Sequence, residues 1–205
     1  MRHRKARSFL NAGNNRSIYM KEDIRRLLEE YGEEILESEE FQKAYQQKHH
    51  KIMTVADHSL GVAIISLKIC RLLEKLHIDI HERELIISAL CHDLGILGRD
   101  EKYKNNLECC SQHPRDSIDI VRSLTGEENR RVEDSIRRHM WPLTLHPPKY
   151  REGFILTAAD KISSAMERMG KSPAAGVSYK KKKRPVKTPE RKLPLPGGGK
   201  PSEKE

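Results

Sequence analysis

Six side chains of the kinds that bind divalent metals are spread along the middle of this sequence in a regular order. They are His58, the adjacent pair His92 and Asp93, His113, His139 and Asp160. Imidazole and carboxylate groups suit zinc, manganese, iron, nickel and cobalt ions. Six such ligands are too many for one tetrahedral ion, but they suit two ions that share a bridging carboxylate. Paired ions of this kind activate water for phosphoester cleavage, so the pattern indicates hydrolytic chemistry.

The spacing of these residues indicates which elements must position them. Every interval between His58, the pair, His113, His139 and Asp160 is long enough for one helix and a loop. Aromatic residues make up only 5% of the sequence and charged residues 34%, which favours a helical protein over a β-sandwich. We therefore expect an all-α fold, a bundle of about six helices, with the site built across it.

Apolar periodicity places several candidate ligands on buried helix faces. Thr54 is a predicted N-cap, and the helix after it carries His58 at the head of its apolar stripe. His92 and His139 continue the apolar faces of two later helices. An unpartnered polar group is costly on such a face, and a shared metal centre would satisfy these side chains together.

The remaining segments are less regular. We expect a loosely ordered stretch over residues 1–17 and helical structure over 21–47, which Gly32 is a candidate to divide into two helices. Further along, we expect a helix over about 82–94 and a loop over 95–112. Pro114 fits the first turn of the next helix, which would put His113 near its N-cap. The last helix is expected over about 151–169.

The net charge of +9 belongs mainly to the ends of the chain. Residues 171–205 carry 11 Lys and Arg against 3 Asp and Glu, and four more cationic residues lie within residues 1–7. The folded body is therefore close to neutral. We expect a basic extension (1–17), a helical domain (18–170) and a disordered basic tail (171–205). The tail suits contact with nucleic acid or an acidic partner.

Cysteine usage and hydropathy suggest the cellular setting. The four cysteines show no C-x-x-C spacing, which favours a reduced, intracellular protein, and we expect a cytoplasmic location. No apolar run approaches ~20 residues, so we expect no membrane span. The N-terminus lacks the apolar segment of a secretory signal.

The order of the six ligands resembles the HD-domain superfamily of metal-dependent phosphohydrolases. The supporting strings are T-V-A-D-H-S-L-G-V-A around His58, L-I-I-S-A-L-C-H-D-L-G around His92 and Asp93, and L-T-A-A-D-K-I around Asp160. The resemblance covers roughly residues 50–169 and implies an HD-type helical bundle. The additional His113 and His139 resemble the two-metal branch of the superfamily.

The resemblance also implies roles for the ligands. One ion would be bound by His58, His92, Asp93 and Asp160, and a second by His113, His139 and the bridging Asp93. The ions are expected to be two of Mn, Fe, Ni, Co or Mg, and a water that they bind would attack the phosphoester. Asp93 would therefore be catalytic as the bridge.

Cationic residues near these motifs are candidates to bind a substrate phosphate. Lys161 and Arg99 are the two that we assign to catalysis, with Arg115 and Arg138 as further candidates. The expected substrate is a small phosphomonoester or phosphodiester, such as a nucleotide. His50 is a candidate substrate contact, or a group that supports a ligand.

Five other histidines have no partner in this pattern and are expected at the surface: His3, His49, His77, His81 and His146. Two other classes of function remain open. An HD-fold di-iron oxygenase has the same order of ligands, so metal analysis and oxygen-dependent turnover would be needed to separate it. A non-catalytic regulatory protein would instead use the basic tail to bind nucleic acid.

Overall fold

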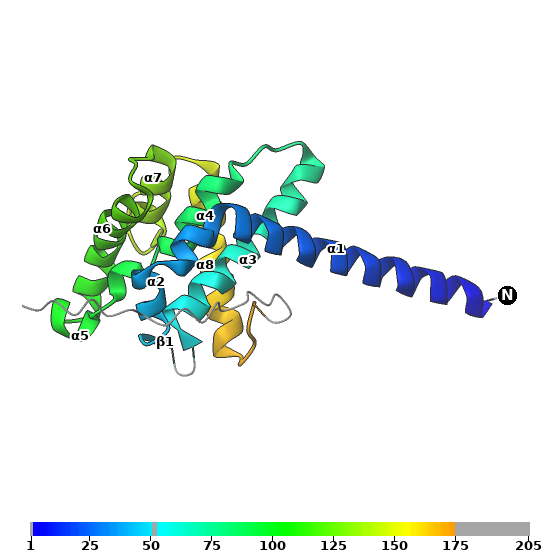
Figure 1. Ribbon diagram of the computed structural model, residues 1–205, viewed down its shortest axis with the longest axis horizontal. Helices are drawn as coiled ribbons and strands as arrows, with labels where there is room; N and C mark the ends of the chain where they lie inside the picture. Colours follow the sequence, from blue (N-terminus) through cyan, green and yellow to red (C-terminus); the bar gives the residue numbers. More distant parts are fainter. Residues whose placement is uncertain (1, 51–52, 175–205) are drawn as a thin grey trace, which may run out of the picture.

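The computed structural model describes residues 2–50 and 53–174, with the backbone alone for residues 2–16 and residue 50. The predicted all-α fold is confirmed, and a short hairpin accompanies the helices (Figure 1). The described helices are α1 (Arg2–Glu37), α2 (Glu39–Ala44), α3 (Val55–Leu73), α4 (Glu82–Cys91), α5 (Arg99–Lys102), α6 (Asn106–Thr125), α7 (Arg130–Arg138) and α8 (Arg151–Arg168). The 3-10 helices are η1 (Glu74–Leu76) and η2 (Leu94–Ile96), and the hairpin pairs β1 (Lys48–His50) with β2 (Met53–Thr54).

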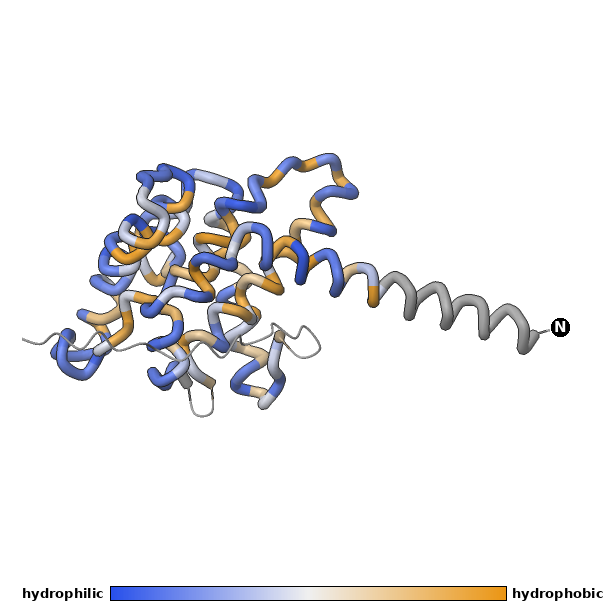
Figure 2. The backbone as a smooth tube through the Cα atoms, viewed as in Figure 1, coloured by the Kyte–Doolittle hydropathy of each residue, from blue (hydrophilic) through white to orange (hydrophobic). Residues whose placement is uncertain are grey.

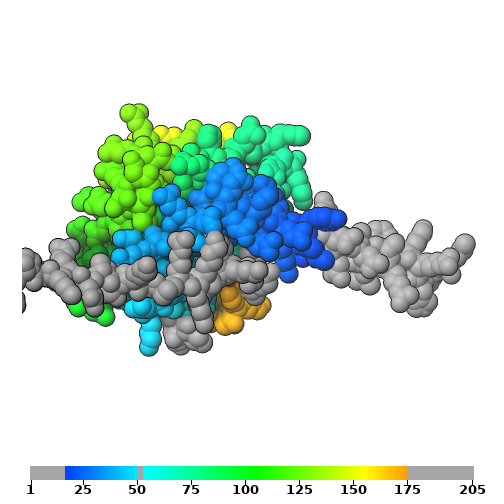
Figure 3. Space-filling view, viewed as in Figure 1, coloured from blue at the N-terminus to red at the C-terminus, as the bar shows by residue number. Residues whose placement is uncertain are grey.

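Helices α3 and α4 form the centre of the bundle. Helix α8 packs along α3, while α7 contacts both α4 and α8, and α6 packs on α7 and η2. Helix α1 lies against α4 and extends away from the bundle toward its N-terminus (Figure 1). Apolar residues gather where the helices cross (Figure 2), and Leu85, Leu90 and Leu156 are fully buried there. On the face shown in Figure 3, α1 lies in front, with α6 and α7 to its left and the segment that precedes α4 above it.

The predicted start of the helix that carries His58 is confirmed. The Thr54 Oγ1 atom accepts a hydrogen bond from the Asp57 amide at 3.1 Å, and the Thr54 hydroxyl donates to Asp57 Oδ2 at 2.7 Å. This cap satisfies an amide that has no partner within the helix. It therefore fixes the first turn of α3, in which His58 lies.

Two predictions for the N-terminal segment are wrong. Helix α1 begins at Arg2, so the stretch expected to be loosely ordered is helical; no proline interrupts it. Helix α1 also continues through Gly32, and the break falls at Ser38, whose side chain accepts from the Phe41 amide and caps α2. A Cβ at Gly32 would lie 2.8 Å from Leu90 Cδ1, so this glycine allows α1 to approach α4 closely.

The predicted loop over residues 95–112 is also wrong. It contains α5 and the first part of α6, and His113 with Pro114 lies inside α6. Asn105 starts α6 because its side chain accepts from the Glu108 amide at 2.9 Å. The Glu108 carboxylate in turn accepts from the Lys104 amide at 2.7 Å. The cap at Asn105 and the bond to Lys104 therefore fix the start of α6 ahead of Pro114.

The packed region extends past the predicted boundary at residue 170. Pro173 is buried, and a Cβ at Gly61 of α3 would lie 3.2 Å from its Cγ atom. Ala174 also packs against the core. The rest of the predicted basic tail lies outside the described residues.

Among residues 2–50 and 53–174, no helix combines the length and the apolar character that crossing a bilayer requires.

Candidate metal centre

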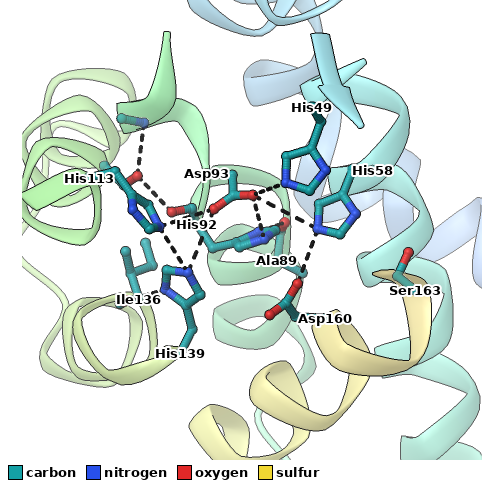
Figure 4. A network of polar contacts seen from close by, with 12 residues as sticks. His49, His58, Ala89, His92, Asp93, His113, Ile136, His139, Asp160 and Ser163 are labelled. Atoms are coloured by element: carbon teal, nitrogen blue, oxygen red, sulfur yellow. Dashed lines mark hydrogen bonds and ion pairs between the residues drawn. The ribbon is translucent and has the colours of Figure 1, made fainter. Parts of the chain in front are cut away.

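The structure brings all six predicted ligands together around the carboxylate of Asp93 (Figure 4). None of the six is more than 9% exposed. They come from three helices and the ends of two others: His58 from α3, His113 from α6, Asp160 from α8, His92 and Asp93 from the residues just after α4, and His139 from the residue just after α7. Residues distant in sequence thus form one buried polar cluster.

The two oxygens of Asp93 face different sets of histidines. We call the first set the Oδ1 end: His113 Nε2 lies 3.3 Å and His139 Nε2 3.6 Å from Oδ1. The second set is the Oδ2 end, in which His92 Nε2 lies 3.4 Å and His58 Nε2 3.9 Å from Oδ2. Asp160 joins the Oδ2 end, since its Oδ1 atom lies 3.2 Å from His58 Nε2. A carboxylate placed in this way suits a bridge between two cations.

Each of these four imidazoles is held from behind through its Nδ1 atom. An Nδ1 that faces a carbonyl or carboxylate oxygen donates a proton to it, so Nε2 is the atom that carries the lone pair once the ring loses its second proton, as a metal ligand must. The four partners are Glu167 Oε1 for His58 (2.9 Å), Ala89 O for His92 (2.9 Å), Cys109 O for His113 (2.7 Å) and Ile136 O for His139 (2.6 Å).

The Nε2 atoms that face inward are better partners for a divalent cation than for one another. The Nε2 atoms of His113 and His139 lie 3.1 Å apart. His92 Nε2 is buried and has no hydrogen-bond partner among the described residues. Lone pairs that converge in this way are satisfied by a metal ion, and imidazole with carboxylate is a donor set typical of transition metals.

The cluster shifts the pKa values of its members strongly. Burial opposes ionisation of Asp93, yet the charge of His92 and hydrogen bonds from His113 and His139 hold the Asp93 pKa well below its usual range. Burial disfavours the protonated form of His58 and so lowers its pKa. The hydrogen bonds to the carboxylates of Asp160 and Glu167 outweigh this effect of burial and raise the His58 pKa to about 10. Asp93 is therefore an anion that can bind a cation at neutral pH.

Helix α6 is positioned by a close contact with the turn after α4. A Cβ at Gly95 would lie 2.2 Å from the carbonyl oxygen of His113 and 2.8 Å from the amide of Ser117. The Ser117 hydroxyl donates to His92 O at 2.7 Å and accepts from the Gly95 amide at 2.9 Å. Gly95 thus lets α6 approach and places His113 beside Asp93.

A cavity of about 450 Å³ opens onto the cluster and is lined by the two cationic residues assigned to catalysis. The Lys161 ammonium lies 2.7 Å from Asp160 Oδ2, and Arg99 donates to Asn106 Oδ1. Lys48 and Arg168, which sequence reasoning did not select, also line the cavity. The further candidates, Arg115 and Arg138, do not line the cavity. Arg115 is exposed away from it, and the Arg138 guanidinium pairs with the Asp134 carboxylate at 2.7 Å.

Sequence reasoning missed two residues of the cluster. His49 was expected at the surface, but its side chain is only 12% exposed and its Nε2 atom lies 3.1 Å from Asp93 Oδ2. The side chain of its neighbour His50 lies outside the described residues. Glu167 holds His58, and its position two helical turns after Asp160 on α8 was a signal that it shares the inward face.

Comparison with known proteins agrees with this geometry. The HD domain family matches residues 55–165, more than half of the chain, and the chain belongs to this family. HD domains bind divalent metals, and their family consists in general of metal-dependent phosphohydrolases. No curated protein and no solved structure matches the chain. All six predicted ligands lie inside the matched range, whereas His49 and Glu167 lie outside it.

Proposed function

We propose that this protein is a metal-dependent phosphohydrolase that cleaves a phosphomonoester or phosphodiester of a small substrate. One observation carries the proposal: four imidazoles, each held through Nδ1, turn their Nε2 atoms toward the two oxygens of one buried carboxylate. Membership of the HD domain family supports it.

The two ends of the cluster would hold one ion each. His113 and His139 with Asp93 Oδ1 would bind the first, and His58, His92 and Asp160 with Asp93 Oδ2 the second. When bound, such ions activate water and neutralise charge on a phosphoryl group. The chain itself supplies the orientation: backbone carbonyls and Glu167 fix the imidazole rings, and Asp93 spans both ends.

The cavity beside the cluster suits a small anionic substrate. Lys161 and Arg99 at its wall are placed to contact phosphate oxygens, and Lys48 and Arg168 add positive charge. The apolar side chains of the same cavity, which include Ile96, Met140 and Leu143, would contact the remainder of the substrate. We therefore propose a phosphorylated small molecule, such as a nucleotide, as the substrate class.

Metal analysis followed by an activity panel tests this proposal. Purified protein should contain transition metal, and metal-stripped protein should regain hydrolysis of a chromogenic phosphomonoester, a chromogenic phosphodiester or a nucleotide when Mn, Co, Ni, Mg or Fe is added. The Lys161→Ala variant should raise KM for the substrate more than that of the control Arg115→Ala, since Arg115 lies away from the cavity. Turnover that requires oxygen and releases no phosphate would instead identify an HD-fold oxygenase.

A further inference from the structure

We infer that His49 is a seventh metal ligand and that it completes the Oδ2 end of the centre. The inference rests on the proposed metal centre, but it concerns a residue outside the range that the HD domain family matches. It also specifies the kind of cation that this end takes.

The geometry around His49 is that of a ligand. Its Nε2 atom lies 3.1 Å from Asp93 Oδ2, the same oxygen that faces His58 and His92. Ligand atoms of His49, His58 and Asp93 all lie within 4.8 Å of one another, a spacing that one ion can span. The His49 ring stacks on that of His58, with centroids 4.1 Å apart and planes 20° apart, so both rings approach Asp93 from the same side (Figure 4).

The hairpin holds His49 in this position through the start of α3. Lys48 pairs with Thr54 across the hairpin, and Thr54 is also the N-cap of α3. The amide of Val55 donates to Gln47 O at 3.0 Å, which closes the base of the hairpin. The strand that carries His49 is therefore joined to the first turn of α3, which carries His58.

A third imidazole changes the chemistry of the Oδ2 end. With His49, that end offers the nitrogens of His49, His58 and His92 beside the carboxylates of Asp93 and Asp160. Nitrogen-rich sites favour Zn, Fe, Co or Ni, whereas Mg prefers oxygen ligands and retains its waters. The structure therefore assigns a transition metal to this end.

Metal titration of two His49 variants tests the inference. In His49→Ala the ligand is lost. In His49→Gln the side-chain amide can still donate a hydrogen bond to Asp93, but it is a poor ligand for a transition metal. The control is His146→Ala, because His146 is an exposed loop histidine. Metal-stripped chains are titrated with Co²⁺ and Zn²⁺ against a chromophoric chelator, and the visible spectrum of the Co²⁺ form is recorded.

Both His49 variants should bind one ion at least about 10–100-fold more weakly than wild type, since loss of a group that only supports a ligand already costs that much. Their Co²⁺ spectra should change, and His146→Ala should match wild type. Circular dichroism checks that the variants remain folded. Wild-type affinity and spectrum in His49→Gln would show that His49 only donates to Asp93 and would overturn the inference.

The remaining outcomes separate this inference from the proposed function. If wild type binds two ions and both His49 variants bind them equally well, His49 is not a ligand, and the metal centre stands without it. If wild type binds neither Co²⁺ nor Zn²⁺, the metal centre is refuted and the inference with it.

Discussion

The two ends of the proposed metal centre are held in place by different groups. At the Oδ1 end, His113 and His139 are held by backbone carbonyls, and Asp93 is the carboxylate that faces both of them. At the Oδ2 end, Asp160 and Glu167 add two further carboxylates around His58. The Oδ2 end is therefore richer in negative charge. It should bind a cation more tightly, but it also holds protons more tightly.

The ends also differ in how the chain assembles them. The Oδ1 end comes from α6 and α7, which follow one another in sequence and are docked through the contact of Gly95 with α6. The Oδ2 end joins the hairpin, α3 and α8, whose residues His58 and Asp160 lie 102 positions apart. Long-range packing is thus needed for the end that we expect to bind more tightly.

Removal of the shared carboxylate should have the largest effect, because it breaks both ends at once. Asp93→Ala should abolish phosphoester hydrolysis and lower metal content at both ends, while the helical circular dichroism signal is largely retained. Asp119→Ala, at an exposed position of α6, is the control. Near-normal activity in Asp93→Ala would contradict the two-metal arrangement.

Removal of one histidine from each end in turn should show which ion each end binds. His113→Ala should lose the more weakly bound ion and His58→Ala the more tightly bound ion, because the additional carboxylates lie around His58. Metal content measured at increasing chelator concentration distinguishes the two. If both variants lose the same ion, the division of Asp93 into two ends is wrong.

Replacement of Glu167 should change how the Oδ2 end responds to pH. The His58 pKa is raised to about 10, so in the metal-free protein His58 stays protonated below that pH, and a cation must displace this proton. Metal affinity at the Oδ2 end should therefore rise as pH rises from about 6 to 8. In Glu167→Gln the His58 pKa falls, so fewer protons compete with the cation and the rise should flatten. Loss of the hydrogen bond that holds the ring should lower the limiting affinity at high pH, where no proton competes, by about 10–100-fold.

Chelator competition at several pH values measures this effect, with Glu128→Gln as an exposed control. Parallel pH curves for wild type and Glu167→Gln would show that Glu167 does not set the protonation of His58.

Removal of the basic tail should have the smallest effect on either end. The truncation belongs after Ala174, because Pro173 packs against Gly61 and Ala174 against the core. The shortened chain should keep its rate on a small phosphoester, whereas any binding to nucleic acid should weaken and lose its steep salt dependence. A lower rate in a chain with intact helicity would indicate that the tail contributes to the active site.

The sequence by itself determined the fold class and predicted the candidate ligands that the fold brings together. Helical periodicity reports which face of a helix is buried, and this was enough to predict that His58, His92 and His139 point inward. The cap at Thr54 is likewise a local signal and was confirmed. These features depend on residues within one or two helical turns, which a single sequence displays directly.

The tertiary structure decided the features that depend on packing between distant segments. Glu167 reaches His58 only because α8 lies along α3, and Gly95 matters only because α6 crosses the turn after α4. Successive side chains of a strand point to opposite faces, so the register of the short hairpin determines whether His49 faces Asp93. The sequence shows two neighbouring histidines with no periodic pattern to separate them, and the pairing of β1 with β2 at the start of α3 places His49 beside Asp93.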